Sequence, residues 1–195
     1  MFANFRGAHS DFRDEALGMS TESKTPVQSN AREPGALLDD LSEVIARHPF
    51  MKGFSPHHCR LLTDCAMVTK FVAGELIFRE GDPANRFYLI QKGKVALEAH
   101  VGTGPVTRIQ TVEAGQVLGW SWMFPPYYWH FDARAIEPTE AIFFYGTPLR
   151  TECDEDHDLG YELVKRMAEV MIERLQATRR QLVGLKMGVQ IKAKA

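Results

Sequence analysis

Residues 72–98 read Val72-Ala-Gly-Glu-Leu-Ile-Phe-Arg-Glu-Gly-Asp-Pro-Ala-Asn-Arg-Phe-Tyr-Leu-Ile-Gln-Lys-Gly-Lys-Val-Ala-Leu-Glu98, and they carry the strongest fold signal in the chain. Short apolar runs alternate here with turn residues. Gly81-Asp82 and Lys92-Gly93 supply turn chemistry, because glycine accepts a positive φ and aspartate can hydrogen-bond its own backbone. The runs between them are rich in aromatic and branched residues, which favour strands. The segment therefore predicts consecutive strands joined by tight turns.

The same pattern extends on both sides of this segment, over residues 67–148. Further glycines interrupt it at positions 74, 102, 104 and 115. The expected strands are 68–72, 75–79, 87–91, 94–101, 107–112, 133–136 and 141–145. Several short strands at this spacing are typical of an all-β sandwich or barrel. We therefore predict one β core over residues 67–148.

Helical periodicity flanks the β core. Residues 36–66 predict two short helices, and Ser55-Pro56 looks like the N-cap and first residue of the second. Residues 155–187 predict one long helix, with acidic residues at its N-terminal end and basic residues towards its C-terminal end, as the helix dipole favours. Residues 1–35 are polar without a sustained period, and we expect a disordered arm.

The long helix has a narrow apolar stripe. Its members recur at intervals of three, four or seven: Leu159, Leu163, Met167, Val170, Met171, Leu175, Leu182 and Leu185. One small barrel does not need a helix of this length to cover a face. We therefore expect part of the stripe to meet a second copy and form a homodimer. Packing of the whole stripe against its own barrel is the alternative.

Composition restricts the functional classes. The formal net charge is -2, which gives no global attraction to nucleic acid or anionic lipid. The three cysteines do not form a Cys-x-x-Cys pair, and a reducing compartment suits them. No apolar run suggests a signal peptide or a membrane span. We expect a cytoplasmic protein of one domain.

The segment 72–98 resembles the first half of a cyclic nucleotide-binding domain of the catabolite activator type. The shared features are Gly-x-x-Ile/Leu-Phe, Glu-Gly-Asp, a Tyr-Leu-Ile strand and a Lys-Gly turn before a strand that begins with Val. The resemblance implies a mainly β fold with flanking helices, a double-stranded β-helix or jelly roll known as a β-roll, followed by a long C-terminal helix. It also implies a ligand-sensing, regulatory function.

In the family that the segment resembles, the ligand is held by a cassette that corresponds here to residues 115–138. The resemblance implies a ribose-binding glutamate at the position of Trp120 and a phosphate-binding arginine at or beside Trp129. A cyclic phosphate buried without a cation is costly to desolvate. We therefore expect a small molecule other than ordinary cyclic AMP. Backbone N–H groups at the start of the cassette's short helix are a further candidate for holding an anion.

Aromatic residues replace the missing polar pair, and all three tryptophans of the chain lie in the cassette. The predicted ligand-binding residues are Leu118, Gly119, Trp120, Ser121, Trp122, Trp129, His130, Phe131 and Arg134. Arg134 is expected on the following strand, without a phosphate role. Two interpretations stay open. The rings line a pocket for a planar or apolar ligand, or they fill the old pocket and leave a ligand-free scaffold.

Other classes fit the sequence less well. A haem-type sensor would use His130, but a lone histidine beside aromatics is more often packed or exposed. No metal-binding His-x-His run, phosphate loop or nucleophile elbow is present, so we expect neither an enzyme nor a metal site. A helix-turn-helix needs several tens of residues and ten follow Leu185, so DNA binding is not expected. The output is expected to pass through an effector protein that the sequence does not identify.

Overall fold

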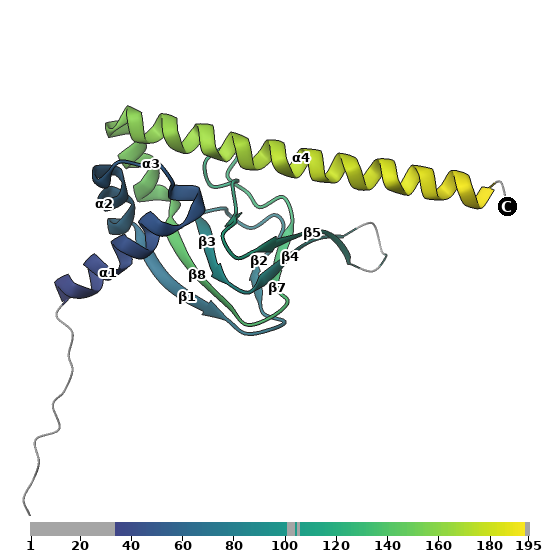
Figure 1. Cartoon of the computed structure of the whole chain (residues 1–195), viewed down its shortest axis with the longest axis horizontal. Coiled ribbons are helices and arrows are strands. Elements are labelled where there is room, and N and C mark those ends of the chain that lie inside the picture. The colour runs from purple at the N-terminus through teal and green to yellow at the C-terminus, as the bar shows by residue number, and fades with distance from the viewer. Residues whose placement is uncertain (1–33, 101–103, 105, 194–195) are drawn as a thin grey trace, which may run out of the picture. The chain divides into compact units, whose positions relative to one another are not determined.

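The chain folds as two helices, a block of strands and two more helices (Figure 1). The computed structural model describes residues 34–100, 104 and 106–193, so most of the predicted arm at 1–35 lies outside the described residues. The helices are α1 (Pro34–Arg47), the 3-10 turn η1 (Pro49–Met51), α2 (Pro56–Asp64), α3 (Gly146–Glu155) and α4 (His157–Ala193). The strands are β1 (Ala66–Phe71), β2 (Leu76–Phe78), β3 (Arg86–Lys92), β4 (Lys94–Ala99), β5 (Thr107–Glu113), β6 (Val117–Leu118), β7 (Asp132–Ala135) and β8 (Thr139–Tyr145).

The strands form two four-stranded antiparallel sheets. Their orders are β1-β8-β3-β6 and β2-β7-β4-β5. Every connection between consecutive strands except the one between β4 and β5 takes the chain from one sheet to the other, so the two sheets enclose one interior. This is the predicted β-roll with flanking helices and a long C-terminal helix, and the fold class is confirmed.

Gly93 lies in the turn between β3 and β4, one of the places where the chain changes sheet. Its φ is +89°, a conformation that side chains with a Cβ rarely adopt. A Cβ at this position would lie 2.5 Å from the carbonyl oxygen of Pro138 and 2.5 Å from Oγ1 of Thr139. The glycine of the Lys92-Gly93 turn is therefore needed both for its backbone angle and for its small volume.

The apolar side chains form two clusters, one on each side of the sheet that contains β3. Phe87 and Leu89 face the helices, whereas Tyr88 and Ile90 face the interior of the roll. This is the alternation of period two that a strand with two buried faces produces. The helix-side cluster also contains Leu163 of α4. The interior cluster is where a ligand of the family would have to find space.

The second helix begins where the sequence predicts. The Ser55 side chain accepts a hydrogen bond of 3.1 Å from the backbone N–H of His58, and Pro56 occupies the first helical position. Such an N-cap contributes about 1 kcal/mol to helix stability. The helix then buries Leu62 completely against the helix-side cluster.

The predicted long helix is preceded by a separate one. Residues 146–155 form α3, which the sequence reasoning did not predict, and α4 begins only at His157. Asp156 separates the two because its backbone is extended, with φ −111° and ψ 92°. Its carboxylate accepts a 3.0 Å hydrogen bond from the N–H of Leu159 and so caps α4. The acidic run at this point thus ends one helix and caps the next.

The apolar stripe of α4 is divided along its length. Leu159, Leu163 and Met167 are fully buried against the same chain, in the helix-side cluster. Leu175 and Leu182 are 67% and 54% exposed. The first part of the stripe therefore has a partner within the chain. No helix among the described residues, α4 included, is both long and apolar enough to cross a membrane.

Arg166 attaches the first part of α4 to the N-terminal helices. Its guanidinium donates hydrogen bonds of 2.8 Å to the carbonyl oxygen of Phe50 and 2.5 Å to that of Lys52. It also lies 4.5 Å from the centroid of the Phe54 ring, a cation–π contact. One side chain thus joins α4 to the segment between α1 and α2.

Candidate ligand-binding site

The cassette between β6 and β7 is a series of turns. Residues 119–131 contain no helix, which corrects the expectation that backbone N–H groups at the start of a short helix could hold an anion. Turn hydrogen bonds run from the N–H of Met123 to the carbonyl of Trp120 and from the N–H of Tyr127 to that of Phe124. The Pro125–Pro126 peptide bond is cis. The N-terminus of a cassette helix is therefore not available to hold an anion.

Trp129 lies inside the roll. It is 4% exposed, and its ring stacks on Phe78 with centroids 3.8 Å apart and planes 10° apart. Gly119 faces it with a φ of +88°, and a Cβ on Gly119 would lie 2.9 Å from the Trp129 ring. The absence of a side chain at Gly119 therefore makes room for the indole. The resemblance implies a phosphate-binding arginine at or beside Trp129. The structure has a packed apolar ring at this position instead.

Trp122 belongs to the other cluster. It is fully buried and stacks on Phe87 with ring centroids 5.2 Å apart. Arg150 of α3 donates a 2.6 Å hydrogen bond to the carbonyl oxygen of Trp122 and lies 4.5 Å from the centroid of the Tyr127 ring. The middle of the cassette is therefore fixed to the helices, with Trp122 as part of the helix-side core.

Three other predicted residues of the cassette contact one another through His130. Trp120 is half-buried and stacks on His130 with ring centroids 5.0 Å apart. His130 is exposed, and its Nδ1 lies 3.1 Å from Oγ of the buried Ser121. This hydrogen bond and the stacking account for the position of the histidine.

The two remaining predicted residues outside the cassette turns have structural partners. Leu118 is fully buried in the interior cluster. Arg134 lies on β7, where its Nε donates a 3.1 Å hydrogen bond to the carboxylate of Glu98 and its Nη1 a 3.0 Å bond to the carbonyl of Gly74. Its charge is thereby matched by Glu98.

A cavity of about 340 Å³ lies between the cassette, the β4–β5 hairpin and α4. Trp120 and Phe131 are the two predicted site residues that line it. The complete lining is Leu97, Ile109, Gln110, Trp120, Phe131, Met171, Arg174, Leu175 and Thr178. Pockets for small molecules have volumes of this order and are mainly apolar with a few polar groups. The open space is thus at the mouth of the roll, outside Trp129.

Arg174 is the charged residue of this cavity, and it is one of the lining residues that were not among the predicted site residues. Its Nη2 donates a hydrogen bond to the carbonyl oxygen of Val117, while Nη1 is buried without a hydrogen-bond partner among the described residues. Burial lowers the pKa of its guanidinium to about 10, against the opposing effect of Glu173. A signal was present in the sequence: Arg174 follows Leu163, Met167 and Val170 at the three-and-four spacing of the buried stripe.

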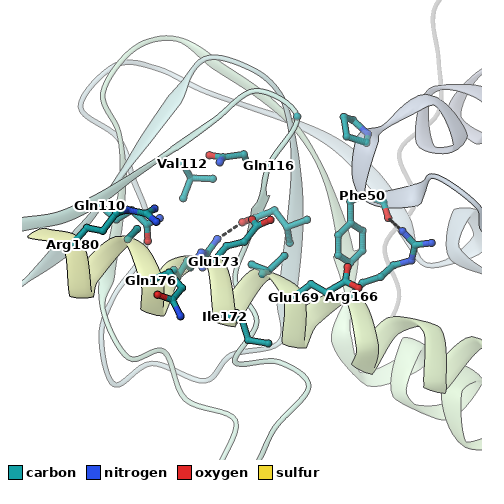
Figure 2. A pocket seen from close by; sticks show the side chains of 16 residues that line it. Phe50, Gln110, Val112, Gln116, Arg166, Glu169, Ile172, Glu173, Gln176 and Arg180 are labelled. Carbon is teal, nitrogen blue, oxygen red and sulfur yellow. Dashed lines mark hydrogen bonds between the residues drawn. The ribbon is translucent and has the colours of Figure 1, made fainter.

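A second cavity, of about 670 Å³, is also lined by residues of α4 (Figure 2). It runs along α4, with Arg180 and Gln110 at one end and Arg166 and Phe50 at the other. Arg174 lines both cavities. Gln110 also lines both, so the two cavities adjoin at these two residues.

Comparison with known proteins identifies the fold and its family. Residues 68–156 match the family model of the cyclic nucleotide-binding domain, and they form a β-roll domain of that family. The CRP-like cAMP-activated global transcriptional regulator of Mycobacterium tuberculosis is 24% identical over 145 residues, which cover 74% of this chain. The chain spans 63% of the length of this curated relative.

Two solved structures illustrate the structural similarity. A cyclic nucleotide-binding domain from Methylobacillus flagellatus has a TM-score of 0.64 at 18% identity, over 76% of this chain and 83% of that chain. The c-di-GMP-responsive global regulator CLP of Xanthomonas campestris has a TM-score of 0.59 at 15% identity, over 68% of this chain and 65% of that chain. At these identities the similarity shows the fold. Two of these three proteins are described as regulators that respond to a nucleotide, the Mycobacterium protein to cAMP and the Xanthomonas protein to c-di-GMP.

Proposed function

We propose that this chain is a cytoplasmic, non-catalytic regulator that senses a small molecule other than ordinary cyclic AMP. The observation that carries the proposal is the cavity of about 340 Å³ between Trp120, Phe131 and α4. It connects the cassette, where the family binds its ligand, with the helix through which the signal would leave. A molecule that binds there contacts both elements at once.

The packing of the roll argues against a cyclic nucleotide in its usual position. The ring of Trp129 lies in the interior and stacks on Phe78, and the cassette offers no cation there. Arg134 is paired with Glu98. A cyclic phosphate placed there would have to displace a packed indole, and neither the cassette nor Arg134 would supply a counter-charge, which is costly in a buried site.

The cavity-lining residues of α4 couple the ligand to the helix. Met171, Leu175 and Thr178 line the cavity from α4. Leu175 is also exposed, as are Tyr161 and Leu182. Tyr161 lies fourteen residues before Leu175 and Leu182 lies seven residues after it, so the three follow a spacing of seven. Such a repeat is typical of helix pairs in coiled coils. A second copy would cover these side chains, and a ligand would act by shifting α4 between two packings.

A ligand-free scaffold is the second candidate, and the packed interior around Trp129 favours it. Native mass spectrometry of protein purified from its own host, with thermal-shift titrations of cyclic AMP and cyclic GMP, decides between the two. We expect a co-purified small molecule and no saturable shift with either nucleotide. A saturable nucleotide shift would refute the argument from Trp129. Absence of both a ligand mass and a shift would support the scaffold.

A further inference from the structure

Arg174 is a largely buried arginine without a salt bridge to any described residue, and the neighbouring Glu173 is the charged residue that favours its protonated form. It forms no ion pair with any described carboxylate, and one terminal nitrogen is buried without a hydrogen-bond partner. Its single hydrogen bond goes to a neutral acceptor, the backbone carbonyl of Val117. Burying a guanidinium in this way is unfavourable unless another group supplies the missing contacts.

The remainder of the cavity defines the body of a ligand. Trp120 and Phe131 from the cassette and Met171 and Leu175 from α4 provide aromatic and aliphatic walls. Gln110 and Thr178 are the neutral polar groups of the lining, and Arg174 is its one charged residue. A doubly charged phosphate ester would lack a second cation in this cavity. One acidic group on an apolar body matches both the charge and the walls.

We propose that the cavity takes a ring-sized apolar molecule that carries a single acidic group, and that Arg174 binds this group. The proposal rests on the proposed function, since it requires a ligand in the same cavity. The positive charge that the family places on the cassette is here supplied by α4. The ligand's anion therefore bonds directly to the helix that would transmit the signal.

The test uses two fluorescent probes that differ only in an acidic group. 8-Anilino-1-naphthalenesulfonate is an anion, and N-phenyl-1-naphthylamine has the same rings without the sulfonate. Both are titrated into the full-length protein, and the measured quantity is the ratio of their dissociation constants. Partial unfolding of a variant would weaken the binding of both probes, so it would leave the ratio of their dissociation constants unchanged. Displacement of the anionic probe by indole-3-acetate, compared with indole-3-acetamide, repeats the test with a carboxylate.

We expect the wild type to prefer the anionic probe and indole-3-acetate over their neutral counterparts. Arg174→Gln should reduce this preference by about tenfold or more, as expected for loss of a hydrogen bond to a charged group. Arg179→Gln makes the same change of charge at an exposed position of α4 and should leave the preference unchanged. Trp120→Ala should weaken both probes alike, which places them in the cavity.

Three outcomes would overturn the inference. If the wild type binds both probes without preferring the anion, the site does not select an acid. If Arg174→Gln lowers the melting temperature but keeps the preference, Arg174 only fastens α4 to β6. Either result leaves the proposed function intact, because a ligand still binds. If neither probe binds saturably to the wild type, the cavity does not take a ring-sized anion and the inference fails, while native mass spectrometry for a co-purified ligand tests the proposed function separately.

Discussion

Replacing Trp129 by alanine is the most direct test of the packed interior. A tryptophan side chain buries about 150–250 Å², and at about 25 cal/mol per Å² this corresponds to about 4–6 kcal/mol. Trp129 is 4% exposed and stacked on Phe78, so almost all of this area is lost on truncation. Measured large-to-small changes of this kind cost about 3–5 kcal/mol. We therefore expect Trp129→Ala to lower the free energy of unfolding by about 4 kcal/mol.

The assay is urea unfolding followed by circular dichroism, with indole as a rescue ligand. Tyr128→Ala is the matched control, because Tyr128 is an adjacent aromatic that is 50% exposed, and its truncation should cost less than about 1 kcal/mol. Indole should raise the melting temperature of Trp129→Ala and leave that of the wild type unchanged, since only the variant has the cavity. A loss below about 1 kcal/mol for Trp129→Ala would refute the reasoning, because the indole would then not be part of the core.

Three further predictions concern α4 and its N-terminal end. Leu182→Asp, at an exposed position of the apolar stripe, should convert a dimer into a monomer in light scattering, and an unchanged mass would contradict the dimer. The hydrogen bond from Leu159 and the nearby His58 lower the pKa of Asp156 from its ordinary value of 3.8. The charged carboxylate therefore stabilises the fold above pH 3.8, and this stabilisation is lost as the pH falls through the lowered pKa. Asp156→Asn should thus lower the melting temperature at about pH 7, and this loss should decrease as the pH falls through the lowered pKa; a loss that is the same at every pH would contradict this. Burial and neighbouring acidic residues raise the pKa of Cys153 to about 11. Iodoacetamide at pH 8 should therefore label this thiol roughly a hundredfold more slowly in the native than in the unfolded protein, as measured by mass spectrometry. Rapid labelling of the native protein would contradict this expectation.

The sequence predicted most of the β core because its signals are local. Glycine turns and runs of aromatic and branched residues mark the strands, and Gly93 and Ser55 act as their residue types indicate. The two-residue strand β6 is too short to produce a pattern of its own. The helix α3 was missed because its acidic residues were assigned to the start of the long helix, and the extended backbone of Asp156 is not apparent from the sequence.

The candidate site was predictable only in part. The resemblance placed tryptophans where the polar pair was expected, but sequence does not tell whether a ring lines a cavity or fills it. Trp129 fills the interior, whereas Trp120 lines a cavity, and the difference depends on the space beside Gly119. Arg174 escaped notice because a charged residue on a helix is normally assigned to solvent. Its exceptional position follows from the contact between α4 and β6, which is a tertiary feature.

Arg166 fixes only the first part of α4, so a small rotation of the helix would produce a larger displacement at its far end. The segment up to this residue is clamped to the backbone between α1 and α2, while the helix continues to Ala193. From Arg174 to that point the helix rises about 28 Å, so a pivot of about 5° at Arg174 would move the far end by roughly 2.5 Å. A change in one guanidinium contact, too small to disturb the roll, would thus be amplified at the distal end of the helix into a displacement that another protein surface could register.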